Sequence, residues 1–305
     1  MDPGIDDALA IILALRSPEL EVQAITTVAG NAELQKTTVN ALRALEAIRC
    51  VNIPVAAGMP RPLLRELVTA SFIHGSDGLG DSSLPKPKIR QTGRHAVNTI
   101  HEILDSHPTR AVSIIATGPL TNIASAILLT PEAMARVQRL VVMGGAYGVT
   151  QYGYGNVTSV AEYNIHTDPE AAKIVFDSGL PVRAVGLDVT TQPDSQFTRA
   201  HYHEASHTRT RTARFVERII RRYMRRFDKL ALHDPVAVAV TACEELGSYK
   251  PYHVDVETMG SLTLGQTVIC RGNRHRSLSK ANAEVSVKIK GSEFLDLFMD
   301  RVVRT

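Results

Sequence analysis

Three aspartates lie close together at the start of the sequence. Asp2, Asp6 and Asp7 are separated only by a Pro-Gly-Ile step, and Pro-Gly favours a turn because proline fixes φ and glycine accepts positive φ. Three like charges at this spacing are costly unless a cation shares them. Oxygen ligands without His or Cys favour a hard cation such as Ca²⁺ or Mg²⁺. The alternative is that these are ordinary acidic residues at a helix start, where negative charge suits the helix dipole.

A polar segment over residues 146–164 offers a second set of chemical groups. It carries Asn156, Glu162 and Asn164, which are neutral or acidic hydrogen-bonding groups suited to hydroxyls rather than phosphates. This set predicts a sugar ligand. The alternative is a glycine-rich surface loop whose amides are solvated.

A His-Asp-Pro step at residues 233–235 opens an apolar stretch. Asp234 directly before Pro235 is typical of a helix start. His233 and Asp234 are therefore either part of a cap or additional members of a site.

The elements that must position these groups alternate along the chain. β-branched or apolar stretches predict strands, and the segments between them predict helices. The strands are expected at 21–28, 54–57, 111–116, 140–143 and 182–187, with shorter ones at 254–257, 267–270 and 284–289 and a closing helix over 292–303. This order predicts an α/β fold, an open and mostly parallel sheet with helices on both faces, formed by one domain over 1–305.

Ligands of such sheets bind outside the carboxyl ends of the strands. Asn31, Thr117 and Gly144 lie at the carboxyl ends of three of the expected strands. We therefore expect them to meet at one edge of the sheet, together with Asp2 if a strand precedes it.

The chain turns basic and helical between His201 and Phe227, where arginines recur at helical spacing around apolar residues. This pattern favours an amphipathic helix with a solvated basic face. A phosphate or nucleic-acid site is the alternative. It is disfavoured because no second basic stretch or aromatic stacking set accompanies the helix.

The composition is that of a soluble enzyme. Hydrophobic residues make up 44% of the 305 residues, charged residues make up 21%, and the net charge is +3. This charge is too small to imply a nucleic-acid or membrane partner. Three cysteines without metal-ligand spacing fit a reducing compartment, and no apolar run is long enough for a membrane span or signal peptide. We expect a cytoplasmic protein.

Six motifs occur in an order that resembles the inosine/uridine-preferring nucleoside hydrolases. They are Asp-Pro-Gly-Ile-Asp-Asp-Ala, Thr-Val-Ala-Gly-Asn, Thr-Gly-Pro-Leu-Thr-Asn, Val-Met-Gly-Gly, Ala-Glu-Tyr-Asn and His-Asp-Pro, within residues 2 to 290. The resemblance implies an open α/β fold with a Rossmann-like core, a bound Ca²⁺ and hydrolysis of the N-glycosidic bond of ribonucleosides. It also implies a homo-oligomer, either a dimer or a tetramer.

The resemblance implies roles for individual residues. Asp2, Asp7 and Asp234 would be side-chain ligands of Ca²⁺ with the backbone carbonyl of Thr117, and Asp2 would take the proton from a Ca²⁺-bound water. The ribose would be held by Asp6, Asn31, Asn156, Glu162 and Asn164, with Met143 packing beside it. His74 and His233 would line the base side, and His233 would be the acid toward the departing base.

Two features depart from this pattern. Family members begin with a hydrophobic strand that ends in Asp-x-Asp-Pro-Gly, whereas here Met1 stands at the x position. We therefore expect a fold that lacks this first strand, and a natural start about six to ten residues upstream. The second departure is the short, arginine-rich stretch before His233, which leaves purine or pyrimidine preference open.

Two other functions compete with an active nucleoside hydrolase. The missing strand suggests a catalytically weak protein that binds Ca²⁺ and ribose. The acidic cluster suggests a metal-dependent phosphohydrolase, but that enzyme would need cationic phosphate clamps beside the carboxylates.

Overall fold

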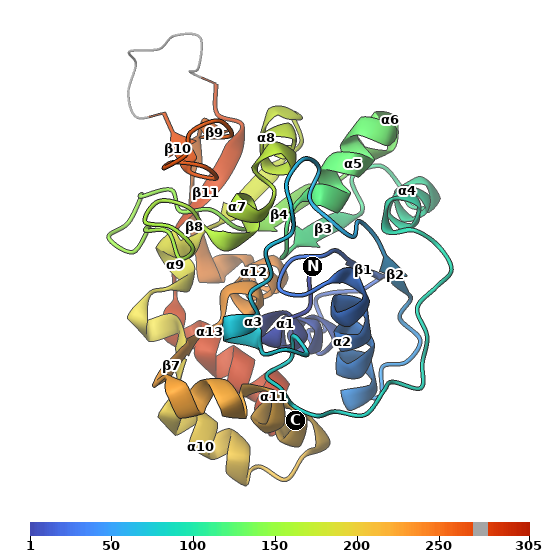
Figure 1. Cartoon of the computed structure of the whole chain (residues 1–305), viewed down its shortest axis with the longest axis vertical. Helices are drawn as coiled ribbons and strands as arrows, with labels where there is room; N and C mark the ends of the chain where they lie inside the picture. The colour runs from blue at the N-terminus through green and yellow to red at the C-terminus, as the bar shows by residue number, and fades with distance from the viewer. Residues whose placement is uncertain (271–279) are drawn as a thin grey trace.

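A five-stranded sheet forms the centre of the computed structural model, which describes residues 1–270 and 280–305 (Figure 1). Its spatial order is β3 (Ser113–Ala116), β4 (Arg139–Met143), β5 (Val182–Val185), β11 (Ala283–Ile289) and β8 (Gly247–Tyr252). The first four strands are parallel and β8 is antiparallel to β11. The predicted mostly parallel α/β fold is confirmed.

Three two-stranded sheets complete the strand inventory of the described residues. β1 (Ile25–Thr27) pairs in parallel with β2 (Val55–Ala57). The other two sheets are antiparallel: β6 (Gln196–Thr198) with β7 (Lys229–Ala231), and β9 (Val254–Val256) with β10 (Thr267–Ile269). The sequence did not predict β6, β7 or β8, because apolar and polar residues do not alternate regularly over a sufficient length in any of these three strands.

The helices lie on both faces of the sheet. The longer ones are α1 (Ile5–Leu15), α2 (Leu34–Ala47), α4 (Ala96–Ser106), α5 (Thr121–Leu129), α8 (Pro169–Asp177), α10 (Arg199–His207), α11 (Arg211–Arg226), α12 (His233–Ala242) and α13 (Gly291–Phe298). Short helices are α3 (Ser71–His74), α6 (Pro131–Met134), α7 (Tyr163–Thr167) and α9 (Leu187–Thr190), and two 3₁₀ turns span Pro193–Ser195 and Glu244–Leu246. The predicted closing helix is α13, followed by a π-helical turn over Met299–Arg304.

Successive residues of β4 contribute to two different hydrophobic clusters. Val141 and Met143 pack with α1, α11, α12 and α13, whereas Leu140 and Val142 pack with α4, α5 and α8. This alternation follows from the two-residue side-chain period of a strand. The two clusters therefore lie on opposite faces of the same sheet.

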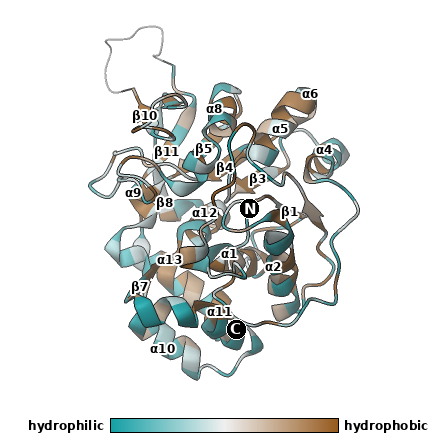
Figure 2. Ribbon diagram, in the orientation of Figure 1, coloured by the Kyte–Doolittle hydropathy of each residue, from teal (hydrophilic) through white to brown (hydrophobic). Residues whose placement is uncertain are grey.

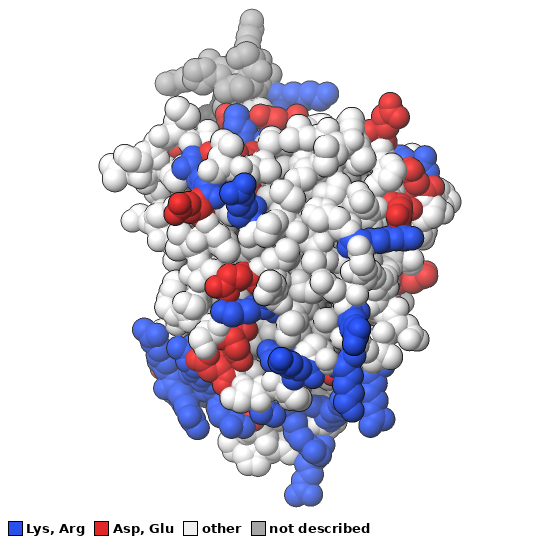
Figure 3. Space-filling view, turned by 45° about the vertical axis from the view of Figure 1, so that its right-hand side comes forward, with Lys and Arg blue, Asp and Glu red and all other residues white. Residues whose placement is uncertain are grey.

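The basic stretch forms two helices rather than one, because residues 208–210 break it between α10 and α11. On α11 the side chains of Phe215, Ile219 and Ile220 are buried, while its arginines are exposed. The predicted amphipathic helix is thus present. Figure 2 shows hydrophilic residues along α10, and Figure 3 shows Lys and Arg gathered at the lower end of the molecule.

The first residues of the chain run beside β1 without forming a strand of their own. The Met1 amino group donates to the carbonyl of Thr26, and the Val28 amide donates to the carbonyl of Met1. The predicted strand over 21–28 is ordered only at Ile25–Thr27, the residues that pair with β2. Residues 21–24 have no strand partner on either side among the described residues. No helix in the described part of the chain is long and apolar enough to cross a membrane.

Candidate active site

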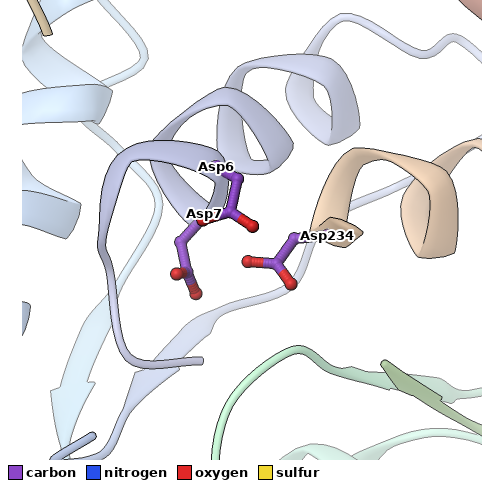
Figure 4. Close-up of side chains that lie close together, drawn as sticks. All are labelled: Asp6, Asp7 and Asp234. Carbon is purple, nitrogen blue, oxygen red and sulfur yellow. The ribbon is translucent and has the colours of Figure 1, made fainter. Parts of the chain in front are cut away.

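Two helix starts bring three carboxylates together. Asp6 and Asp7 lie in the first turn of α1, and Asp234 lies in the first turn of α12, which packs against α1. Their ligand atoms lie within 4.8 Å of one another, and Figure 4 shows the three side chains converging between the two helices. Among residues 1–270 and 280–305 this is the one such group of His, Cys, Asp or Glu.

Gly4 allows the turn that aims these carboxylates. A Cβ at this position would lie 2.5 Å from Nδ1 of His74 and 2.9 Å from Nδ2 of Asn31. The backbone therefore passes closer to both side chains than any larger residue permits. This explains why a glycine stands between Asp2 and the start of α1.

Asp2 lies directly beside the group of three and is fully buried. Its Oδ2 accepts a hydrogen bond from the Asn31 amide at 2.6 Å, and its own amide donates to Oδ1 of Asp7 at 3.2 Å. Its Oδ1 has no hydrogen-bond partner although the atom is buried. Leaving a buried carboxylate oxygen without a partner is costly, and a cation held by these oxygens would remove that cost.

Asp7 accepts more hydrogen bonds from neutral donors than Asp2 does. It accepts hydrogen bonds from the Gly4 amide at 3.0 Å, from Nδ2 of Asn31 at 3.2 Å and from the Thr117 hydroxyl at 3.3 Å. These contacts place Asn31 and Thr117, both at strand ends, beside the acidic cluster. The predicted meeting of strand ends is therefore present for Asn31 and Thr117.

Burial raises the pKa of all four carboxyl groups. The pKa values of Asp2 and Asp234 are raised well above the ordinary value by burial, and neighbouring aspartates raise them further. Burial and the charge of Asp7 raise the pKa of Asp6 to about 8, and burial also raises that of Asp7. Without a cation the cluster retains protons at neutral pH. Its all-oxygen donor set suits a hard divalent cation.

A cavity of about 250 Å³ opens above the cluster. All of the residues predicted to bind substrate line it, and so does His233. They are Asp6, Asn31, His74, Met143, Asn156, Glu162, Asn164 and His233, together with Thr117 and Asp234. Asp2 and Asp7 lie outside this lining, since both are fully buried.

Glu162 caps α7 from the rim of the cavity. Its carboxylate accepts hydrogen bonds from the amides of Gly145, Asn164 and Ile165 at 2.9–3.1 Å. Asn164 in turn donates from Nδ2 to the carbonyl of Met143 at 3.2 Å. Both side chains are thus fixed before any ligand arrives.

Asn156 is less enclosed than the other predicted sugar-binding residues. It is exposed, and its Oδ1 accepts a hydrogen bond from the Tyr163 amide at 2.9 Å. Its position at the cavity edge agrees with a peripheral contact to the ligand.

The two histidines face the cavity as neutral imidazoles. Nδ1 of His74 accepts from the Ile5 amide at 3.1 Å, and Nδ1 of His233 lies 2.8 Å from the hydroxyl of Thr190. Burial lowers the pKa of each histidine to about 4. A buried imidazole resists protonation.

The site also contains three aromatic residues and one threonine that were not predicted to belong to it. Phe72, Tyr163 and Tyr223 line the cavity, and Thr190 contacts His233 from behind. Tyr223 follows the buried residues of α11 at helical spacing, so this spacing could have indicated that its side chain points toward the protein interior. Tyr163 belongs to the Ala-Glu-Tyr-Asn motif, which could have indicated it. Phe72 and Thr190 follow no motif, since only the tertiary fold brings them to the site.

The chain matches one family model over nearly its whole length. The model described as "Inosine-uridine preferring nucleoside hydrolase" covers residues 1–296. An enzyme of that description from Leishmania major is 40% identical over 99% of this chain and 96% of its own length. A pyrimidine-specific ribonucleoside hydrolase from Salmonella arizonae is also 40% identical, with the same coverage of both chains.

Solved structures agree with this assignment. A plant nucleoside hydrolase superposes with a TM-score of 0.91 at 30% identity, covering 100% of this chain and 98% of its own. A purine-preferring ribonucleoside hydrolase from Gardnerella vaginalis gives 0.89 at 30% identity, covering 99% and 96%.

The protein is thus a hydrolase that acts on N-glycosyl compounds. More particularly, the chain belongs to the inosine-uridine preferring nucleoside hydrolase family, and the resemblance found in its motifs is confirmed. The relatives named above differ in the base they prefer.

Proposed function

We propose that this enzyme cleaves ribonucleosides into free base and ribose with the help of one Ca²⁺ ion. Membership in the family supports hydrolysis of ribonucleosides. The observation that carries the proposal is the buried, unpartnered Oδ1 of Asp2 beside three converging carboxylates. This all-oxygen site lies at the floor of a cavity lined by the polar groups that we propose to bind the sugar.

Asp2, Asp7, Asp234 and the carbonyl of Thr117 would hold the cation. When bound, the ion neutralises the carboxylates and lowers the pKa of a water that it orients. Asn164 supports this assignment, because its Nδ2 lies 3.5 Å from the Thr117 carbonyl and keeps that strand end in place.

The remaining polar groups would bind the ribose. Cleavage passes through an oxocarbenium-like state, in which positive charge grows on the sugar. Carboxylate and amide oxygens of Asp6, Asn31, Asn156, Glu162 and Asn164 would surround that charge, and Met143 would pack beside the ring. Three backbone amides already hold Glu162 in its place, so this carboxylate requires little reorganisation.

Asp2 and His233 would complete the reaction, one at the attacking water and the other at the departing base. Asp2 would accept the proton of the attacking water, because its Oδ1 is free of other donors. His233 would donate a hydrogen bond from Nε2 to the departing base and stabilise the negative charge that develops there, because a neutral imidazole keeps its one proton at neutral pH. The hydroxyl of Thr190 would donate to Nδ1 of His233, so that the neutral ring carries its proton on Nε2. His74 would contact the base from the same cavity.

Ribose release tests the proposal directly. Purified enzyme should liberate ribose from inosine, uridine or both, and the activity should disappear with a chelator and return with Ca²⁺. Asp2→Asn should abolish turnover. His207→Ala, which changes an exposed histidine on α10, serves as the control and should leave the activity unchanged.

Two alternative functions give different results in the same assay. A catalytically weak Ca²⁺- and ribose-binding protein would bind both without releasing ribose. A phosphohydrolase would release inorganic phosphate from nucleotides. The latter is disfavoured because no Lys or Arg lines the cavity in the described structure.

We also propose a cytoplasmic homo-oligomer. The resemblance to the family suggests the assembly, and three cysteines outside any disulfide, Cys50, Cys243 and Cys270, suit a reducing compartment. Light scattering on the purified protein measures its mass in solution and tests the assembly.

A further inference from the structure

Two adjoining hollows lie along the exposed side of α11. The larger hollow has a volume of about 560 Å³ and lies between α11 and residues 80–83. The smaller hollow has a volume of about 240 Å³ and lies between α11, α2 and residues 84–85. Arg218 lines both, so the hollows meet at this side chain. Neither of them shares a lining residue with the active-site cavity.

Arginine is the commonest residue in the lining of both hollows. The larger hollow is lined by Arg218, Arg221, Arg222 and Arg225, and the smaller one adds Arg43, Arg211 and Arg214. Two carboxylates, Asp81 and Glu46, accompany these seven arginines. The lining therefore carries five more positive than negative charges, although the whole chain carries a net charge of only +3. Figure 3 shows Lys and Arg gathered at this end of the molecule.

The four arginines of the larger hollow share one face of α11. Their spacing of three and four residues makes them neighbours on a helix, where like charges are destabilising. Glu217, the one acidic residue of α11, pairs with Arg221 at 2.7 Å, and Asp81 pairs with Arg222 at 3.1 Å. The other two arginines form no ion pair with any described residue. The repulsion along this face is thus only partly compensated, and a bound anion would relieve it.

Hydrogen bonds to neutral oxygens fix the arginine at which the hollows meet. Arg218 donates from Nε to the Ser82 carbonyl at 2.6 Å and from Nη2 to the Ser83 carbonyl at 2.7 Å. Arg43 is held in the same manner by the carbonyls of residues 84–85 at 2.9 and 3.2 Å. A carbonyl oxygen bears no full charge, so both guanidinium groups are positioned without being neutralised. Guanidinium groups held in this way lose little freedom on binding and suit the oxygens of a phosphate.

The segment that forms the other wall of the larger hollow is fixed against α11. Gly80 has a φ of +74°, and a Cβ there would lie 2.0 Å from the carbonyl oxygen of Ile219, so this close approach requires a glycine. The Asp77 carboxylate accepts hydrogen bonds from the amides of Asp81 and Ser82 at 2.9 and 3.0 Å. Both walls of the hollow are therefore in place before a ligand arrives.

The length and lining of the hollows indicate a small anion with several phosphates. The stretch from Arg218 to Arg225 is about 10 Å long at 1.5 Å per residue, so a single phosphate would reach only part of the row. Nucleic-acid strands stack their bases on aromatic side chains. Phe215 is the one aromatic residue in the lining, and it is buried. A strand of nucleic acid is therefore the poorer occupant.

We propose that the two hollows form a binding site for the phosphate chain of a small molecule, either inorganic triphosphate or a nucleoside triphosphate. The arginines of the larger hollow would bind the oxygens of the chain in bidentate pairs, and the smaller hollow would add positive charge at one end. The active-site cavity has no Lys or Arg in its described lining, so the phosphates would find no such partners there. The ligand would contact α11, the helix that also places Tyr223 in that cavity.

Calorimetry on the whole protein tests the proposal. The probes are inorganic phosphate, inorganic triphosphate and adenosine triphosphate, each titrated at the same free Ca²⁺ concentration so that no probe withdraws the ion proposed for the acidic cluster. We expect one triphosphate per chain, weaker binding of inorganic phosphate, and an affinity that falls as the salt concentration rises. Tighter binding of adenosine triphosphate than of inorganic triphosphate would identify a nucleotide as the ligand. Otherwise the ligand is the inorganic chain.

A matched pair of double variants locates the site. Arg222→Gln with Arg225→Gln removes two exposed guanidinium groups from the larger hollow. Triphosphate binding should weaken roughly tenfold or more, because charged hydrogen bonds are lost. Arg90→Gln with Arg110→Gln removes the same charge from exposed positions outside both hollows and should leave the affinity unchanged. Circular dichroism should show that both variants are folded.

Three results would overturn the proposal. The first is that neither triphosphate binds. The second is an equal loss of affinity in the two double variants, which would reduce the effect to net charge. The third is a single-stranded oligonucleotide that binds more tightly than either triphosphate and depends on Arg222 and Arg225, which would assign this surface to nucleic acid. Ribose release plays no part in these measurements, so their failure and that of the proposed function are distinguishable.

Discussion

Thr190 offers the sharpest test of how His233 works. Its side chain is fully buried at the end of α9, and its hydroxyl lies 2.8 Å from Nδ1 of His233. With the His233 pKa lowered to about 4, the ring is neutral at pH 7 and carries one proton. A hydroxyl that donates to Nδ1 forces that proton onto Nε2, the nitrogen left for the departing base. Thr190→Val removes the donor and keeps the shape.

The size of the effect follows from the hydrogen bond that is lost. Leaving a buried acceptor without its donor costs about 1–3 kcal/mol, and each factor of ten in rate corresponds to about 1.4 kcal/mol. We therefore expect kcat for inosine to fall by roughly 5- to 150-fold in Thr190→Val. His233→Ala, which removes the whole imidazole, should cost roughly 10²- to 10⁴-fold.

Comparison of leaving groups separates this role from a structural one. Steady-state kinetics on inosine and on p-nitrophenyl riboside should show a large loss only for inosine, because p-nitrophenolate departs without a proton. Thr190→Ser retains the hydroxyl and should restore most of the activity. Equal losses on both substrates, or a normal kcat for inosine in Thr190→Val, would refute the positioning role.

Three further predictions concern the carboxylates. Calorimetry on chelator-treated protein should find one Ca²⁺ site that Asp7→Ala and Asp234→Ala each abolish, and unchanged binding in both variants would contradict the ligand assignment. The increase in melting temperature caused by Ca²⁺ should grow between about pH 4 and about pH 8. The pKa of Asp6 is about 4 in the unfolded chain and is raised to about 8 in the folded protein. The Ca²⁺-free protein therefore loses stability as the pH rises through that window. A constant Ca²⁺ effect across these pH values would argue against it. Glu162→Gln should lower the stability by about 1–3 kcal/mol in denaturant unfolding, because one of three amide donors would lose its acceptor, whereas Glu132→Gln, an exposed control on α6, should not.

The sequence predicted the strands that have a clear local pattern of apolar residues. β3, β4 and β5 lie within one or two residues of their expected bounds, because each is a continuous apolar run between turn residues. The sequence did not predict strands correctly where their formation depends on pairing with a neighbouring strand. Residues 21–24 have strand-like composition but no partner on either side, so only Ile25–Thr27 are ordered as a strand. β8 alternates in burial but contains a proline, and it exists because β11 provides an edge.

The candidate site was predictable to the extent that its residues follow strand ends or helix starts. Asn31 and Thr117 were expected at one edge of the sheet, and both contact Asp7. Thr190 could not be found in this way. It stands 43 residues before His233 and belongs to no motif, so only the packing of α9 against α12 brings the two together.

The protonation states could not be predicted from the sequence at all, because they depend on burial. One cause, removal from water, acts in opposite directions on the two kinds of group: it raises the pKa of Asp2, Asp6, Asp7 and Asp234 and lowers that of His233. A divalent cation reverses only the first of these shifts, since it neutralises the carboxylates and brings no negative charge to the imidazole. At neutral pH the loaded site would therefore combine ionised acids with a neutral histidine. The acid limb of its activity would then follow the protonation of the carboxylate cluster and the accompanying loss of the cation.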